Sequence, residues 1–232
     1  MWKGKLKAVT FSFDDGAVQD ERVVDILNKY GLKGTFNLNS GRLGSVGSSI
    51  RLGRSLVRDM VLAKDVKEIY AGHEVACHTV AHPNLTQLSD DAIVYQIERD
   101  RQLLSDLCGY EIVGMAYPGG GVNHDDRVAE VVRTRTGVKY ARGNGTTWSF
   151  DVPANLYDFE GTCHFVDPIK LMAAGEKFLS LNTDKYQLFY IWGHAYELDY
   201  TTGINWKSFE EFCKMISGRD DIYYGTNKEV LL

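Results

Sequence analysis

Apolar and polar residues along the chain follow patterns that predict strands and helices in regular succession. The residues from Leu6 to Phe13 are mostly apolar or β-branched, which predicts a buried strand. From Gln19 to Tyr30 the apolar residues recur at helical spacing, and Gly31 follows as a stop signal. The same signals predict further strands at Gly34–Leu38, Glu74–Cys77, Gly114–Tyr117, Val138–Ala141, Gln187–Trp192 and Ile222–Tyr224. Further helices are predicted at Ser89–Cys108, Asp125–Thr136, Asp167–Leu181 and Asn205–Ser217, with a short helix capped by Asp65.

Two stretches fit neither pattern. Asn39–Gly53 is rich in Gly and Ser and is interpreted as a long surface loop, whereas Asn144–Phe165 is interpreted as a place for short extra strands. Strands and helices otherwise alternate over the whole chain, which indicates an α/β fold with parallel strands, and the number of strands suggests a barrel. We find no internal repeat and no linker, so a single domain over residues 1–232 is expected.

The composition limits the partners and the compartment. The net charge of −5 and the lack of a basic block argue against nucleic acid as a partner. No apolar run approaches the roughly 20 residues of a membrane-spanning helix, and the N-terminal segment lacks the apolar core of a signal peptide. The widely spaced cysteines Cys77, Cys108, Cys163 and Cys213 are interpreted as free, mostly buried thiols. A cytoplasmic location is therefore favoured, with removal of a signal as the alternative.

Two histidines four residues apart, His78 and His82, are the first candidates for chemistry. On one helical turn positions i and i+4 lie on the same face, so both imidazoles could reach one metal ion. The zinc-protease motif needs a glutamate directly after the first histidine, and Thr79 stands there instead. A catalytic zinc usually has three protein ligands, so two histidines leave the site incomplete. The alternative at this point is a pair of hydrogen-bonded histidines without a metal.

Other polar residues follow directly on predicted strands. They are Asp14 and Asp15, the Pro118-Gly119 turn, Arg142 and His194. In a barrel the carboxyl ends of the strands share one rim, and active sites are built there. This placement favours the metal interpretation, because Asp15 completes a site of two histidines and one carboxylate that suits zinc.

The remaining groups fit the hydrolysis of an acyl bond. Asp14 is free to act as a general base, or alternatively to orient a ligand histidine. The Gly119 turn can aim a backbone N–H at an oxyanion, or be an ordinary loop. His194 can donate a proton to a leaving group, or be a buried, hydrogen-bonded histidine. The same metal ligands also suit a non-haem iron oxygenase, although the alternation of strands and helices opposes that fold.

Four segments resemble the motifs of the polysaccharide deacetylase family, also called the NodB homology domain or carbohydrate esterase family 4. These segments are Thr10–Gly16, His78–Pro83, Ala116–Gly120 and Ile191–His194. The resemblance implies a distorted (β/α)7 barrel, one divalent metal, commonly zinc, and removal of acetyl groups from N-acetylated sugars or O-acetylated xylan. It implies that Asp15, His78 and His82 bind the metal. It also implies that Asp14 is the base, His194 the acid and Gly119 the source of an oxyanion-binding N–H.

The chain departs from the family at two places. The third motif usually opens with an arginine, and Ala116 stands at that position. The fourth motif has no clean match, because Trp148 and Asp151 occur in the wrong order. Arg142 ends a neighbouring strand, and we predict that it approaches Asp14 in place of the missing arginine; a surface arginine is the alternative.

The resulting prediction is a metal-dependent hydrolase that removes acetyl groups from a carbohydrate. One alternative is a hydrolase of a small non-sugar amide on the same fold. Another is a carbohydrate-binding relative with impaired catalysis.

Overall fold

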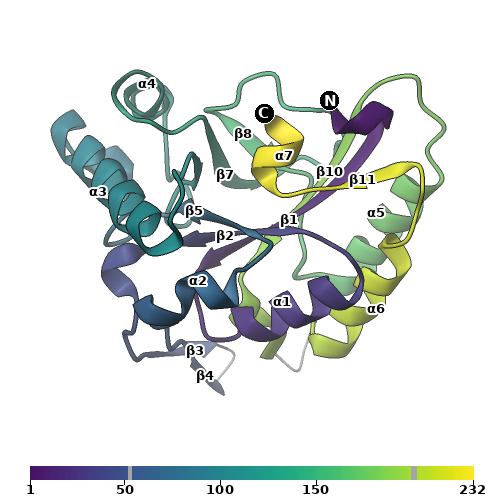
Figure 1. The fold of residues 1–232 in the computed structure, drawn as a ribbon, viewed down its shortest axis with the longest axis horizontal. Coiled ribbons are helices and arrows are strands. Elements are labelled where there is room, and N and C mark those ends of the chain that lie inside the picture. Colours follow the sequence, from purple (N-terminus) through teal and green to yellow (C-terminus); the bar gives the residue numbers. More distant parts are fainter. Residues whose placement is uncertain (52–53, 200–202) are drawn as a thin grey trace.

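The structure, a computed structural model, describes residues 1–51, 54–199 and 203–232 (Figure 1). Its centre is a nine-stranded sheet with the order β8-β7-β6-β5-β2-β1-β10-β9, and β11 also pairs with β1. All of these pairings are parallel, as the alternation of strands and helices predicts. The strands are β1 (Lys7–Asp15), β2 (Gly34–Leu38), β5 (Glu74–Cys77), β6 (Gly114–Ala116), β7 (Tyr140–Thr146), β8 (Phe159–Gly161), β9 (Cys163–His164), β10 (Gln187–Gly193) and β11 (Ile222–Tyr224).

The sheet closes into a ring through one segment, Phe159–His164. Its first half, β8, pairs with β7, and its second half, β9, pairs with β10. Between them the Thr162 amide donates to the Tyr190 carbonyl at 2.8 Å, and the Thr162 carbonyl accepts from the Trp148 amide at 2.9 Å. Both ends of the strand order therefore meet in this segment. Counted as one strand, and with the short β11 left aside, it completes a seven-stranded barrel, as the family resemblance implies.

Helices cover the outer face of the sheet, with α5 beside α6 on one flank and α3 beside α4 on the other (Figure 1). The helices are α1 (Asp20–Lys29), α2 (Val66–Ile69), α3 (Asp90–Cys108), α4 (Asp126–Arg135), α5 (Pro168–Leu179), α6 (Trp206–Ile216) and α7 (Asn227–Leu231). Short 3-10 turns lie at η1 (Trp2–Gly4), η2 (Ser40–Arg42), η3 (Ala63–Asp65), η4 (Leu85–Gln87) and η5 (Ala195–Asp199).

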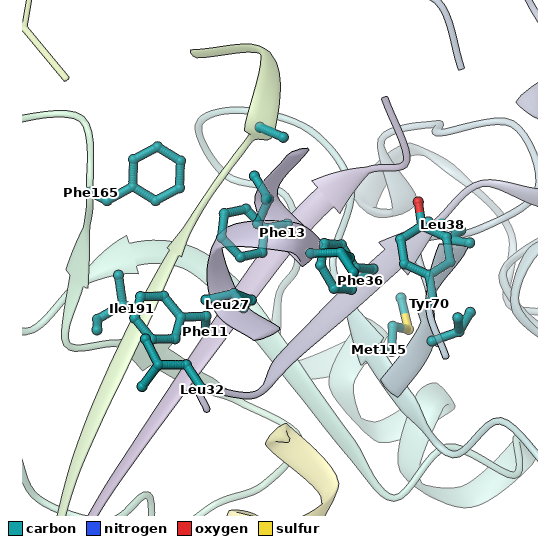
Figure 2. Close-up of a cluster of buried hydrophobic side chains, with 14 of the residues drawn as sticks. Phe11, Phe13, Leu27, Leu32, Phe36, Leu38, Tyr70, Met115, Phe165 and Ile191 are labelled. Atoms are coloured by element: carbon teal, nitrogen blue, oxygen red, sulfur yellow. The ribbon is translucent and has the colours of Figure 1, made fainter. Parts of the chain in front are cut away.

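The main core lies between the sheet and these helices. Successive side chains of a strand point to opposite faces, so Phe11 and Phe13 of β1 join Phe36 of β2 and Leu27 of α1 in one apolar cluster (Figure 2). The intervening residues of β1 point into the ring, where polar side chains bond to one another. Ser12 Oγ accepts from Asn37 at 2.9 Å, and the Asn227 side chain of α7 donates to Tyr190 at 2.6 Å.

Most predicted elements are confirmed, and β2, β5 and β11 have the predicted bounds. The prediction of a loop over Asn39–Gly53 is wrong in part, because Ser40–Arg42 form a turn and β3 (Ser48–Arg51) pairs with β4 (Arg54–Val57) in an antiparallel hairpin. Residues 52–53 lie outside the described residues. This hairpin forms a sheet of its own. Its sequence therefore lacks the alternation of apolar and polar residues that predicts a strand of the main sheet.

Smaller corrections concern single ends and short elements. The strand predicted at Val138–Ala141 lies at Tyr140–Thr146. Its second half is polar and lies at the rim, so the apolar pattern does not reveal where the strand ends. Asp65 precedes α2, but its side chain makes no capping hydrogen bond. The extra strands expected in Asn144–Phe165 are β8 and β9. The helix α7 was not predicted, because five residues are too few to show a helical period.

The four cysteines are free and buried, as predicted. In the described part of the chain, none of the helices combines the length and the apolar character needed to cross a membrane.

Candidate active site

The carboxyl ends of the strands surround a cavity of about 430 Å³ on one rim of the barrel. Its lining includes six of the residues predicted from the sequence: Asp14, Asp15, His78, His82, Gly119 and His194. The seventh, Arg142, is fully buried beside the cavity and contacts Asp14. Arg58, Tyr117, Asn144, Trp192 and Tyr196 complete much of the wall. The structure thus brings every predicted site residue to one place, while their chemical roles remain predictions.

Asp15 and the two histidines form a compact donor cluster. Asp15 Oδ1 lies 3.4 Å from His82 Nε2 and 3.8 Å from His78 Nε2. This carboxylate oxygen is buried and has no hydrogen-bond partner among the described residues. The backbone of Asp15 has a φ of 83°, a left-handed conformation that turns the end of β1 away from the extended direction. Asp14 and Asp15 therefore face the same cavity although they are adjacent in one strand.

The two histidines are brought together by a tight turn, which is one of the two alternatives, a turn or a helix, that the sequence leaves open after the strand. Thr79 has a φ of 69° and His82 a φ of 59°, both in the left-handed region. Thr79 Oγ1 accepts from the His82 amide at 3.1 Å, and the Asn39 side chain donates to the carbonyls of His78 and Thr79. The two imidazole centroids are 4.9 Å apart. Sequence spacing alone could not distinguish this turn from a helix.

The cluster fits a divalent metal ion such as zinc. His78 Nδ1 bonds to the Ala116 carbonyl at 2.8 Å, which fixes the ring so that Nε2 faces Asp15. Burial and the charge of His78 lower the pKa of His82 to about 4, so its imidazole is neutral, as a metal ligand must be. The orphaned Asp15 oxygen supplies the third donor.

A second group of donors, His164, His194 and Glu197, does not suit a metal. His164 Nδ1 accepts from the Val166 amide at 3.1 Å, so in the neutral ring Nε2 carries the proton. That Nε2 lies 3.2 Å from Glu197 Oε2 and acts as a donor toward it. No lone pair of His164 is left to bind an ion.

Asp14 is held by two donors that bond to the same oxygen. Arg142 contacts Asp14 Oδ1 at 2.5 Å, and the Asn37 side chain donates to it at 2.8 Å. Burial alone would raise the pKa of Asp14, but the charge of Arg142 leads the effects that outweigh it and lower the pKa. Asp14 is therefore a carboxylate at neutral pH, and its second oxygen remains to accept a proton.

His194 directly follows β10 on the same wall and is paired with Glu197. The Glu197 carboxylate accepts from the His194 amide at 3.1 Å and lies 3.5 Å from His194 Nδ1. Burial lowers the pKa of His194, but the bond to Glu197 and the charges of Glu197 and Asp14 outweigh burial and raise the pKa to about 9. The imidazole is thus protonated at neutral pH, as a proton donor must be.

Gly119 lies on the cavity wall with a φ of 98°, a backbone conformation that residues other than glycine rarely adopt. Its carbonyl accepts from the Asn144 side chain at 2.8 Å, which ties the glycine turn to β7. The turn is therefore a fixed part of the wall.

Sequence reasoning missed several residues of the site. Glu197 follows His194 by three residues, and Asn37 shares the inward side of β2 with Thr35, so both had a signal that could have been used. Arg58 had none, because it follows the hairpin and lies 43 positions from Asp15, whose Oδ2 it contacts at 2.5 Å. A contact of that kind depends on the path of a loop.

The fold and the rim define a class of protein: a parallel α/β barrel with two histidines and two buried carboxylates, Asp14 and Asp15, on one cavity wall. Comparison with known families agrees with this class, since the model of the family "Polysaccharide deacetylase" matches residues 3–141. The chain therefore belongs to the polysaccharide deacetylase family.

Similar proteins include the peptidoglycan-N-acetylglucosamine deacetylase PgdA of Listeria monocytogenes, which is 30% identical over 128 residues. That match covers 54% of this chain and 24% of the relative, so the chain spans about a quarter of its length. Among solved structures, a mutant of peptidoglycan deacetylase PdaC from Bacillus subtilis has a TM-score of 0.55 at 18% identity, covering 98% of this chain and 90% of that one. A CE4 family pseudoenzyme from Bacillus anthracis has a TM-score of 0.56 at 15% identity, covering 97% and 66%. The two solved structures support the fold.

Proposed function

We propose that the protein is a metal-dependent hydrolase that removes acetyl groups from an N-acetylated or O-acetylated carbohydrate. The proposal rests chiefly on the Oδ1 atom of Asp15, which is buried and has no hydrogen-bond partner among the described residues. This oxygen faces the imidazoles of His78 and His82, and the Asp14 carboxylate lies in the same cavity. Family membership supports acetylated carbohydrate as the substrate class. We further propose that residues 1–232 act as one domain, since residues from β1 to β11 share one core.

A divalent ion held by Asp15, His78 and His82 would supply Lewis acidity toward the acetyl carbonyl and make a water molecule a stronger acid. Asp14 takes the proton of the attacking water at its second carboxylate oxygen, while Arg142 and Asn37 keep the first oxygen fixed.

His194 gives its proton to the departing amine or alkoxide as the bond to the acetyl carbon breaks. Its position on the cavity wall, with Glu197 behind it, supports this role. The backbone N–H of Gly119 shares the negative charge that develops on the acetyl oxygen. Trp192 and Tyr117 form part of the same wall, where both side chains are almost fully buried.

Acetate release from a panel of substrates tests this proposal. The purified protein is treated with a chelator, reloaded with zinc and incubated with chitooligosaccharides, peptidoglycan fragments, acetylated xylan and small N-acetyl amides. Zinc-dependent acetate from a carbohydrate, absent in Asp14→Asn, is the expected result. Acetate from the small amides alone would favour the non-sugar alternative. Carbohydrate binding without acetate from any substrate would favour an impaired relative, such as the pseudoenzyme among the similar structures.

A further inference from the structure

Buried polar side chains connect α7 with the candidate site through the inside of the barrel. Asn227, the first residue of α7, is fully buried, and its backbone amide donates to Thr35 Oγ1 at 2.8 Å near the amino end of β2. The next amide, of Lys228, donates to the Glu74 carboxylate at 2.9 Å at the amino end of β5. The helix α7 therefore lies at the edge of the barrel opposite to the rim that carries the site.

The side chain of Asn227 is held at both ends in this interior. Its Oδ1 accepts from Thr10 Oγ1 at 2.8 Å, while its Nδ2 donates to the Tyr190 hydroxyl at 2.6 Å and to Ser12 Oγ at 3.2 Å. All three partners are buried. A buried amide group with partners on both its oxygen and its nitrogen is fixed in orientation, and it fixes the hydroxyls of Ser12 and Tyr190 in turn.

Each of these two hydroxyls stands directly behind one of the two groups that bond to Asp14. Ser12 Oγ accepts from the Asn37 side chain at 2.9 Å, and the same amide group donates to Asp14 Oδ1 at 2.8 Å. Tyr190 shares a side-chain hydrogen bond with Arg142, whose guanidinium contacts the same carboxylate oxygen at 2.5 Å. Two routes from α7 thus end at one oxygen of Asp14. We call the connected residues the interior network: Asn227, Ser12, Tyr190, Asn37, Arg142 and Asp14.

We propose that Asn227 is a positioning residue for the general base Asp14. Its amide group fixes the two hydroxyls behind Asn37 and Arg142, so the carboxylate is held from the far side of the barrel. The other oxygen of Asp14 has to point at the attacking water, and a displacement of about 1 Å at such a group costs roughly 100-fold in rate. This inference rests on the proposed function, and it makes α7 a working part of the site.

The split between kcat and KM tests the assignment, on the carbohydrate from which the zinc-loaded parent protein releases most acetate. Asn227→Leu keeps the approximate size of the side chain but has no donor or acceptor. Its kcat should fall by about 10- to 100-fold while KM stays near the parent value, because no group of the substrate loses a contact. Zinc affinity, measured in competition with a chromophoric chelator, should stay at the parent value, since the three proposed metal ligands lie outside the interior network.

Thr226→Ala is the matched control, because it weakens the same helix. It removes the N-cap of α7, whose side chain accepts from the Glu229 amide, and it leaves every side chain of the interior network in place. This variant should lose stability and keep the parent kcat. Equal losses of kcat in Thr226→Ala and Asn227→Leu would mean that Asn227 serves only to hold the helix, which overturns the proposal.

Ser12→Ala keeps the test decisive if Asn227→Leu does not fold. It removes the oxygen that the amides of Asn37 and Asn227 share, and it leaves α7 unchanged. Its kcat should fall on the order of tenfold, as the loss of about one hydrogen bond predicts. Where both variants fold, the combined variant should lose less than the product of the two single effects. A parent-like kcat in either single variant would overturn the proposal.

Urea unfolding without substrate, in the presence of a chelator, separates a failure of this inference from a failure of the proposed function. The loss of unfolding free energy in Asn227→Leu combined with Asp14→Asn should be smaller than the sum of the single losses, because both changes break one network. Ser12→Ala takes the place of Asn227→Leu if that variant does not fold. Such coupling, with no acetate from any substrate, would uphold the hold on Asp14 and overturn deacetylation. Additive losses would overturn the inference, and acetate released by the parent protein would then leave deacetylation standing.

Discussion

Replacing Arg142 by methionine should destabilise the protein strongly. The guanidinium is fully buried, with 0% of its surface exposed, and Asp14 is only 3% exposed. Arg142 contacts Asp14 at 2.5 Å, donates to the Gly143 carbonyl at 2.7 Å and lies 4.5 Å from the centre of the Trp192 ring. Methionine fills most of this volume but supplies neither a charge nor a donor.

The size of the effect follows from what Asp14 keeps. In Arg142→Met the buried carboxylate retains the Asn37 bond alone. Removing one partner of a buried ion pair typically costs about 3–5 kcal/mol, because the other charge stays desolvated. Removing both charges costs much less, since no uncompensated carboxylate remains. We therefore expect Arg142→Met to lose about 3–5 kcal/mol, and the double variant with Asp14→Asn to recover a large part of that loss.

Urea unfolding of the parent, both single variants and the double variant, in the presence of a chelator, gives the four free energies of unfolding. The double variant should lose less stability than the sum of the single losses, with a coupling energy above about 1 kcal/mol. A loss below about 1 kcal/mol in Arg142→Met, or additivity of the two changes, would refute a strongly coupled buried pair. Arg142→Lys keeps the positive charge but loses the planar guanidinium with its several donors. Its free energy of unfolding should therefore lie between those of the parent and Arg142→Met.

Four further predictions concern the site and the stability. Asp15→Asn should lose most of its zinc affinity in a chelator competition, and retention of full affinity would exclude Asp15 as a ligand. Asp14→Asn and His194→Ala should keep zinc while turnover falls by about 10²–10⁴-fold; near-normal turnover of either variant would remove its catalytic role. Glu197→Gln removes the anion that favours the imidazolium, so the pKa of His194 should fall below about 9 and the alkaline limb of the pH–rate profile should move to lower pH. An unmoved limb would mean that His194 does not set it. Burial and the nearby charge of Lys33 lower the pKa of His73 from 6.5 to about 4, while its Nδ1 accepts from the Gly34 amide. As the pH falls, His73 is therefore protonated in the unfolded chain before it is protonated in the folded protein. The free energy of unfolding is highest above pH 6.5 and should decline by on the order of 3 kcal/mol as the pH falls to about 4. Urea unfolding at pH 7 and pH 4.5 measures this decline, which His73→Asn should reduce.

The parts of the fold that depend on a buried, periodic pattern could be predicted from the sequence. The strand at Gly34–Leu38 is buried along its whole length, and its predicted bounds are those observed. The helix after Asp125 begins where that side chain accepts from the Val128 amide, as a capping signal predicts. The rim residues followed from the same strands, because parallel strands put their carboxyl ends at one edge.

The parts that depend on loops could not be predicted in this way. The turn at Thr79 and His82 needs two left-handed residues that are not glycine, and no pattern in the sequence indicates them. The closing segment Phe159–His164 is split around Thr162 and too short for a clear alternation. The approach of Arg142 to Asp14 could be inferred, because a strand end carries Arg142 to the rim, whereas the route of Arg58 depends on the hairpin before it.

The hairpin of β3 and β4 carries one edge of the cavity separately from the barrel. Among the residues that the structure describes, β3 and β4 pair only with each other, apart from the barrel sheet, so insertions or deletions between them leave the ring and its register in place. The backbone hydrogen bonds of Asp59 and Val61 to the chain that follows Asp15 lie beyond the hairpin, and they keep Arg58 at the cavity whatever the hairpin's length. Changes in the hairpin can therefore alter the cavity wall near Arg58 while the barrel strands that carry Asp14 and Asp15 keep their register. Chimaeras that exchange this segment between relatives would show whether substrate preference moves with the hairpin while the barrel is left unchanged.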